Sequence, residues 1–95
     1  MPGVTFERDG PIALVTLTRA ECRNAVDGPT ARELRAAFEA FEADATLRVA
    51  VLSGAGGHFC AGADLVALAD PARRNQVEPD GRGPGPMGPT RMAFR

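Results

Sequence analysis

The sequence predicts an α/β fold in which a β-hairpin is followed by a β-α-β unit. Three observations indicate this. Residues 4–8 and 12–18 alternate apolar and polar side chains on either side of Asp9-Gly10, as two half-buried strands joined by a tight turn do. Residues 29–44 place apolar side chains three and four positions apart, which is the helical period. Residues 49–52 form an unbroken apolar run, typical of a strand covered on both faces.

The hairpin is the first predicted element. Gly10 is free to take the positive φ that a tight turn between twisted strands requires. Pro11 stands at the start of the second strand, where its missing N–H costs no central ladder bond. The residues of that strand predicted to face a core are Ile12, Leu14 and either Val15 or Leu17.

Residues 27–44 carry the signals of an amphipathic helix. Asp27 is a good N-cap, and Pro29 is a good first-turn residue. Arg35 and Glu39 lie one turn apart and form a predicted surface ion pair worth about 0.3 kcal/mol. The apolar stripe expected to face the core consists of Leu34, Ala37, Phe38 and Phe41.

A third strand is predicted at 47–53. A strand-helix-strand connection is right-handed in nearly all proteins, so this strand should lie parallel to the second one. Its C-terminal end opens onto the glycine- and alanine-rich residues 54–63, and ligands of open α/β sheets bind at such ends. Small residues let a ligand approach bare backbone N–H groups closely. A short helix is predicted at 64–69, limited by Pro71.

The composition changes after residue 69. Residues 70–90 are rich in proline and glycine and contain almost no large apolar side chains, so they bury too little surface to offset the entropy of ordering. We therefore expect three regions. Residues 1–69 form the folded portion, residues 70–90 a mobile loop or disordered tail, and residues 91–95 the start of an undeveloped helix.

Composition and charge exclude several classes of protein. Ninety-five residues suffice for one small domain. The net charge of −1 gives no general field that attracts nucleic acid or an acidic membrane. No leader-like segment opens the chain, and no apolar run approaches the length of a membrane span. We expect a cytoplasmic protein with neither nucleic-acid nor membrane partners.

The residues suited to bind a metal are too few. Cys22 and Cys60 lie far apart, and with the single His58 they do not make up a set of three or four ligands at workable spacing. We expect two free, partly buried thiols and no metal. His58 has no apparent triad partner and is expected to be a surface or packing residue rather than a general base.

Three pieces of the sequence together resemble the N-terminal part of the enoyl-CoA hydratase/isomerase (crotonase) superfamily. They are residues 59–65 (FCAGADL), 23–25 (RNA) and 49–54 (VAVLSG). The resemblance covers residues 4–68, and residues 85–89 match a subgroup more weakly. It implies the N-terminal part of a crotonase-like (ClpP/crotonase) spiral fold, of which 95 residues are well under half the usual domain.

The resemblance implies chemistry on acyl-CoA thioesters. In this family two backbone N–H groups stabilise the enolate oxygen, and losing one donor typically costs about 3 kcal/mol of barrier. The first donor corresponds to Ala63. Arg23 is expected to contact the CoA part of the substrate through its guanidinium fork, which suits phosphate oxygens. The backbone expected to line the CoA path belongs to Ala25, Ala61, Gly62, Asp64 and Leu65.

Other parts of a family active site have no match in this chain. Coenzyme A is part of the substrate, so no separate cofactor is expected. The second donor and the acid/base glutamates come later in the family's sequences, and nothing before Arg95 matches them. We therefore expect a truncated enzyme, inactive alone. The family assembles as trimers or hexamers through C-terminal elements, so the assembly of this chain stays open.

Two further functions remain as alternatives. The chain could be a non-catalytic acyl-CoA-binding or partner-binding module built on the same fold fragment. Residues 54–57 could form a phosphate-binding glycine loop, although no Lys-Ser/Thr follows them. Without the resemblance, Arg23 reads as a solvated loop arginine, and Asn24 as a residue that bonds its own turn.

Overall fold

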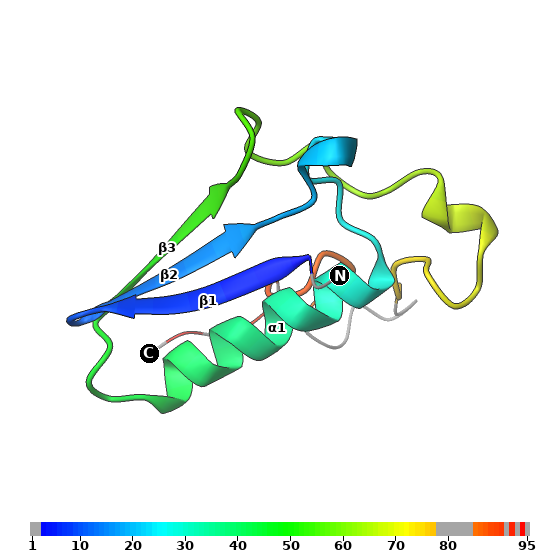
Figure 1. The fold of residues 1–95 in the computed structure, drawn as a ribbon. Helices are drawn as coiled ribbons and strands as arrows, with labels where there is room; N and C mark the ends of the chain where they lie inside the picture. The colour runs from blue at the N-terminus through cyan, green and yellow to red at the C-terminus, as the bar shows by residue number, and fades with distance from the viewer. Residues whose placement is uncertain (1–2, 78–84, 91, 93, 95) are drawn as a thin grey trace.

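A computed structural model describes residues 3–77, 85–90, 92 and 94. It contains one three-stranded sheet with a helix lying along one of its faces (Figure 1). The α/β architecture predicted from the sequence is confirmed. The elements in chain order are β1 (Val4–Asp9), β2 (Ile12–Leu17), the 3₁₀ turn η1 (Ala20–Cys22), α1 (Gly28–Ala43), β3 (Val49–Gly54) and the 3₁₀ turn η2 (Ala67–Ala69).

The strands follow the predicted topology. β2 lies in the middle of the sheet, antiparallel to β1 and parallel to β3. The turn differs from the prediction by one residue. Because Asp9 pairs with Ile12, the two turn residues are Gly10 and Pro11 rather than Asp9 and Gly10. Gly10 takes the positive φ of +57° at the first turn position.

The two faces of β2 are buried to different extents. Ala13, Val15 and Leu17 face α1 and are buried, whereas Ile12 and Leu14 lie half-buried on the opposite face. The expectation that Ile12 and Leu14 face the core was therefore wrong. Successive side chains of a strand point to opposite faces, and α1 covers the face of the odd-numbered residues.

Helix α1 begins as its sequence predicts, and three of the four residues of its predicted apolar stripe contact the core; Phe41 is half-buried and lies outside the core cluster. The Asp27 carboxylate accepts a hydrogen bond from the Thr30 N–H at 2.9 Å, which confirms the N-cap. Leu34 and Ala37 are buried against the sheet, and Phe38 is partly buried. The core cluster consists of Val15, Leu17, Val26, Ala31, Leu34 and Ala37.

The open face of the sheet carries apolar side chains. Val49 and Val51 in β3 are 48% and 45% exposed, and Thr5 to Asp9 in β1 are also exposed. The prediction that both faces of β3 are covered was wrong for the described residues, as was that of a half-buried β1. A single helix can cover only one side of the sheet, and both strands lie at its edges.

The described part of the proline- and glycine-rich stretch packs against α1. Gly88 lies so close that an added Cβ would come 2.6 Å from the Ala31 carbonyl oxygen, and Met87 contacts the core cluster. The Asn75 amide donates to the Pro86 carbonyl at 2.7 Å. Mobility over 70–90 stays a prediction, and residues 78–84 lie outside the described residues.

Two predicted helical segments have different outcomes. The helix predicted at 64–69 is reduced to the 3₁₀ turn η2, and Leu65 before it is 76% exposed. The helix start predicted at 91–95 falls largely outside the described residues, because 91, 93 and 95 are not among them. Among residues 3–77 and the described positions beyond 84, no helical segment combines the length and the apolar character that a membrane crossing demands.

Replacing Leu34 with alanine tests the packing of α1 on the sheet. Leu34 is 4% exposed in the core cluster, so Leu34→Ala should lower the free energy of unfolding by about 3 kcal/mol through lost burial and a residual cavity. The matched control is Arg35→Ala on the solvent side, which should change it by less than about 0.5 kcal/mol. Urea titrations followed by circular dichroism measure both; equal effects would contradict this packing.

Candidate functional site

The main-chain N–H of Ala63, in the loop after β3, is held in place by the bonds of its two neighbours. The Val26 N–H donates to the Gly62 carbonyl at 2.7 Å, and the Asp64 N–H donates to the Val26 carbonyl at 2.8 Å. These two bonds form a parallel bridge between Val26 and Ala63. In this bridge Val26 bonds the two neighbours of Ala63, and Ala63 itself makes neither bond. The N–H of Ala63 therefore points away from Val26. Ala63 is exposed, and its N–H has no acceptor among the described residues.

Asn24 ties this loop to the end of β2. Its side chain is fully buried and accepts from the Arg19 N–H at 2.8 Å. It also donates to the Ala55 carbonyl at 2.9 Å and the His58 carbonyl at 2.7 Å. The expectation that Asn24 bonds only its own turn was therefore wrong, since two of its three bonds reach more than thirty residues along the chain.

Glycine is required where β3 ends. A Cβ added at Gly54 would collide with the carbonyl oxygens of His58 and Phe59. This close approach lets residues 58–59 fold back over the strand end and directs the chain toward Ala63. His58 itself is exposed, as predicted, and contributes through its backbone.

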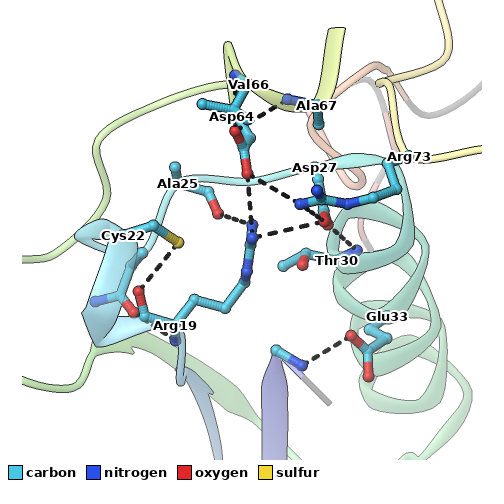
Figure 2. Close-up of polar contacts among 12 residues, drawn as sticks. Arg19, Cys22, Ala25, Asp27, Thr30, Glu33, Asp64, Val66, Ala67 and Arg73 are labelled. Carbon is cyan, nitrogen blue, oxygen red and sulfur yellow. Dashed lines mark hydrogen bonds and ion pairs between the residues drawn. The ribbon is translucent and has the colours of Figure 1, made fainter. Parts of the chain in front are cut away.

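An ionic cluster lies directly beneath the Val26–Ala63 bridge. It consists of Arg19, Asp27, Asp64 and Arg73 (Figure 2). One Arg19 nitrogen lies 3.1 Å from the Asp64 carboxylate and 3.6 Å from that of Asp27. One Arg73 nitrogen lies 3.2 Å from Asp27 and 3.5 Å from Asp64. Asp27 and Asp64 are only 6% and 7% exposed. Each of these buried carboxylates therefore has its charge balanced by the two arginines named above.

The environment holds both carboxylates in the charged form. Burial opposes ionisation of Asp64, but hydrogen bonds from Arg19 and the Ala67 N–H outweigh it and lower the pKa of Asp64. For Asp27, burial is likewise outweighed by hydrogen bonds from Thr30 and Arg73, so the pKa of Asp27 is lowered too. Neither carboxyl group can release a proton at neutral pH, because neither holds one.

The structure brings most of the predicted site residues together. Arg23 is exposed, has a φ of +54°, and accepts from the Ala61 N–H at 3.0 Å through its carbonyl. Gly62 takes a φ of +96°, which turns the chain into the bridge. The exposed Ala61 and Leu65 flank this segment on its two sides.

Two predicted site residues are committed to the fold. The Ala25 N–H donates to the Cys22 carbonyl, and the Ala25 carbonyl accepts from Arg19. The Asp64 side chain lies in the ionic cluster, and its second oxygen caps the next turn by accepting from the Val66 and Ala67 N–H groups. Both residues are also buried, so they support the neighbouring exposed backbone rather than offer free polar groups to a ligand.

The sequence interpretation did not identify Arg19 and Arg73, and recognised Asp27 only as a helix cap. Arg19 and Asp64 are 45 positions apart, and no periodic pattern joins them. The one available signal is an arginine placed directly after a buried strand. The two cysteines are free and partly buried, as predicted. Within the described ranges, no group of histidine, cysteine, aspartate and glutamate side chains could hold a metal ion.

Comparison with known proteins decides the family. A family model for enoyl-CoA hydratase/isomerase matches residues 7–82. The chain belongs to this family. It is similar to the probable enoyl-CoA hydratase EchA14 of Mycobacterium tuberculosis, with 44% identity over 73 residues, which cover 73% of this chain and 28% of that protein. It is also 44% identical over 66 residues to the carnitinyl-CoA dehydratase of Citrobacter koseri, covering 68% of this chain and 25% of the relative.

Solved structures give the same family. The enoyl-CoA hydratase EchA1 from Mycobacterium marinum superposes with a TM-score of 0.84 at 38% identity, covering 99% of this chain and 35% of that one. This likeness confirms the N-terminal portion of the crotonase-like fold. The present chain thus spans about a quarter to a third of the length of the enoyl-CoA hydratase/isomerase relatives that it matches.

Acidification should weaken the ionic cluster. The pKa values of Asp27 and Asp64 are lowered by folding, so their contribution to stability is complete above about pH 4 and is lost as the pH falls through the folded values. We expect the melting temperature to fall progressively below about pH 4. Thermal unfolding followed by circular dichroism between neutral and acidic pH measures it.

Two variants assign the acid-sensitive part. Asp64→Asn should flatten this acid dependence in part, because one of the two titrating groups is gone. The matched control is Asp44→Asn, since hydrogen bonds from the Thr46 hydroxyl and N–H lower the pKa of Asp44 but its side chain is more exposed. Asp44→Asn should therefore flatten the profile less. Equal flattening by both, or a level profile in the parent protein, would contradict the role of the cluster.

Proposed function

We propose that this chain forms the CoA-binding and first oxyanion-donor part of an enoyl-CoA hydratase/isomerase active site, with the Ala63 N–H as the donor. The observation that carries the proposal is the N–H of the exposed residue Ala63, which has no acceptor among the described residues and lies between two neighbours that are both bonded to Val26. A donor fixed in this way needs no reorganisation when a thioester oxygen becomes negative.

The chemistry follows from where charge develops. When a proton leaves the α-carbon of an acyl-CoA, or a nucleophile adds to the β-carbon of an enoyl-CoA, negative charge builds on the thioester oxygen. A preorganised N–H stabilises that charge more than it stabilises the neutral carbonyl, which lowers the barrier. Because a backbone atom supplies the hydrogen bond, the Ala63 side chain needs only to be small.

The names of relatives support a CoA thioester as the ligand. They include an enoyl-CoA hydratase, a carnitinyl-CoA dehydratase and a mevalonyl-CoA hydratase. The acyl groups in these names differ, whereas the CoA ester is common to them. We propose that the exposed Arg23 contacts a phosphate of CoA, and that Ala61, Gly62 and Leu65 line its path, with the buried Ala25 and Asp64 supporting them from behind.

The proton-transfer step has no group assigned to it in the described residues. Asp27 and Asp64 are buried, charged and paired with arginines, and the Glu33 carboxylate accepts from the Gly3 N–H at 3.0 Å. We therefore propose that the 95-residue chain alone binds the thioester without turning it over. The alternative is a module whose physiological role is acyl-CoA binding or partner binding rather than catalysis.

Two substitutions of Ala63 test the donor. Acetoacetyl-CoA is a suitable ligand because it ionises to an enolate. Ala63→Pro removes the N–H and should weaken binding of this enolate roughly tenfold or more, the contribution of one hydrogen bond to a charged group. Ala63→Gly keeps the N–H and should bind like the parent protein. Titration calorimetry measures both, with free CoA as the ligand expected to show little change. Equal enolate affinity for all three proteins would refute the assignment.

A turnover assay separates the catalytic from the binding-only interpretation. With crotonyl-CoA the isolated chain should show hydration only at background level. Hydration is measured by the loss of the enoyl absorbance. If the same sequence lies within a longer protein that hydrates crotonyl-CoA, Ala63→Pro there should reduce kcat far more than it raises KM. Hydration well above background by the 95 residues alone would show that this chain contains an acid/base group.

A further inference from the structure

We propose that Arg19 is the positioning residue for the Ala63 N–H, acting by holding both members of the Val26–Ala63 bridge through one guanidinium group. On the Val26 side it bonds the adjacent Ala25 carbonyl, and on the Ala63 side it bonds the adjacent Asp64 carboxylate. The inference rests on the proposed function for the role of the Ala63 N–H as an oxyanion donor. The way in which Arg19 holds this N–H in place does not depend on that function.

The bridge fixes Ala63 from both sides. Gly62 accepts from Val26, and Asp64 donates to Val26, so the residues immediately before and after Ala63 are each bonded to one partner. Consecutive Cα atoms are about 3.8 Å apart, which leaves little freedom for a residue whose two neighbours are held. The direction of the Ala63 N–H therefore depends on whether the bridge stays closed.

The Arg19 guanidinium contacts both bridge segments, at Ala25 and at Asp64 (Figure 2). Its Nη1 donates to the Ala25 carbonyl, and its Nη2 lies 3.1 Å from Asp64. Its own backbone N–H bonds the Asn24 side chain, so the residue is anchored at the end of β2. Two different nitrogens are used for the two sides, and only the planar fork of arginine offers them in one fixed geometry.

Burial explains why loss of Arg19 should be felt at the bridge rather than elsewhere. The Asp64 carboxylate is buried, and a buried charge that loses its partner is strongly unfavourable. The least costly relief is for the Asp64 segment to move outward into water, which opens the bridge. Arg73 also faces Asp64, at 3.5 Å, but its side chain is 42% exposed and, among the described residues, bonds only the two carboxylates. It cannot replace the bond to Ala25.

Amide hydrogen exchange tests the inference without any ligand. In the parent 95-residue chain, the Val26 and Asp64 amides that close the bridge should be protected. In Arg19→Gln their exchange should be faster by roughly tenfold or more, while the amides of β2 change by less than about twofold. Residue-resolved exchange by nuclear magnetic resonance gives these rates.

Two further variants make the measurement specific. Arg19→Lys keeps the charge but has one ammonium group, so the bridge amides should exchange at an intermediate rate; this variant also serves if Arg19→Gln does not fold. The matched control is Arg8→Gln, which breaks the exposed ion pair of Arg8 with Asp44 at 2.8 Å, near the hairpin end of the sheet. It should leave the bridge amides unchanged.

The outcomes separate positioning from function. Faster exchange confined to the bridge, with partial rescue by lysine, supports the proposal. Equal acceleration across β2, unchanged bridge rates in Arg19→Gln, full rescue by lysine, or an unprotected bridge in the parent chain would each overturn it. Acetoacetyl-CoA added to the same samples then tests the proposed function. If the parent Ala63 amide resonance does not respond to the ligand while the exchange result holds, the proposed function fails and the positioning role stands.

Discussion

Two buried carboxylates determine how the parts of this chain meet. Asp27 starts α1, and Asp64 follows the loop that carries Ala63; both lie out of water and both are ionised. An arrangement of this kind is stable only with cationic partners at hydrogen-bonding distance. Arg19 and Arg73 meet that requirement, and in doing so they bring the end of β2 and the segment after η2 to the same place. The junction thus fixes four separate stretches of chain with one set of interactions.

The candidate donor depends on this junction although no side chain at Ala63 takes part. A parallel bridge engages alternate backbone groups, so closing it between Val26 and its partner leaves the N–H of that partner directed outward. The same geometry would form with many small residues at position 63. The specificity of the site therefore lies in the neighbours, in Gly62 for the turn and in Asp64 for the anchor.

Local signals were sufficient to predict the hairpin, α1 and β3, but not the short 3₁₀ turn η2, which had been predicted as a longer helix. Period-two and period-3.6 patterns placed the hairpin and α1, and the Asp27-Pro29 pair marked the start of the helix. The parallel pairing of β3 followed from chain connectivity alone. The run of small residues at 54–63 was correctly placed at the C-terminal end of β3.

Properties that depend on layers or on distant partners could not be predicted. Which face of β2 is covered depends on where α1 lies, and a strand alone gives only the alternation. Asn24 and Arg19 bond groups far along the chain, and the composition of residues 85–90 gives no sign that Gly88 packs against α1. These are long-range interactions between polar or small residues, which leave no periodic trace in the sequence.

The two edges of the sheet are unequally protected. β1 carries Glu7, Arg8 and Asp9, charges that discourage pairing with another strand, whereas β3 reads VAVLSG and bonds only β2 among the described strands. A second molecule can add to the unguarded edge without desolvating any charged side chain of β3. Because encounters between molecules rise with the square of concentration, dilution limits pairing at this edge.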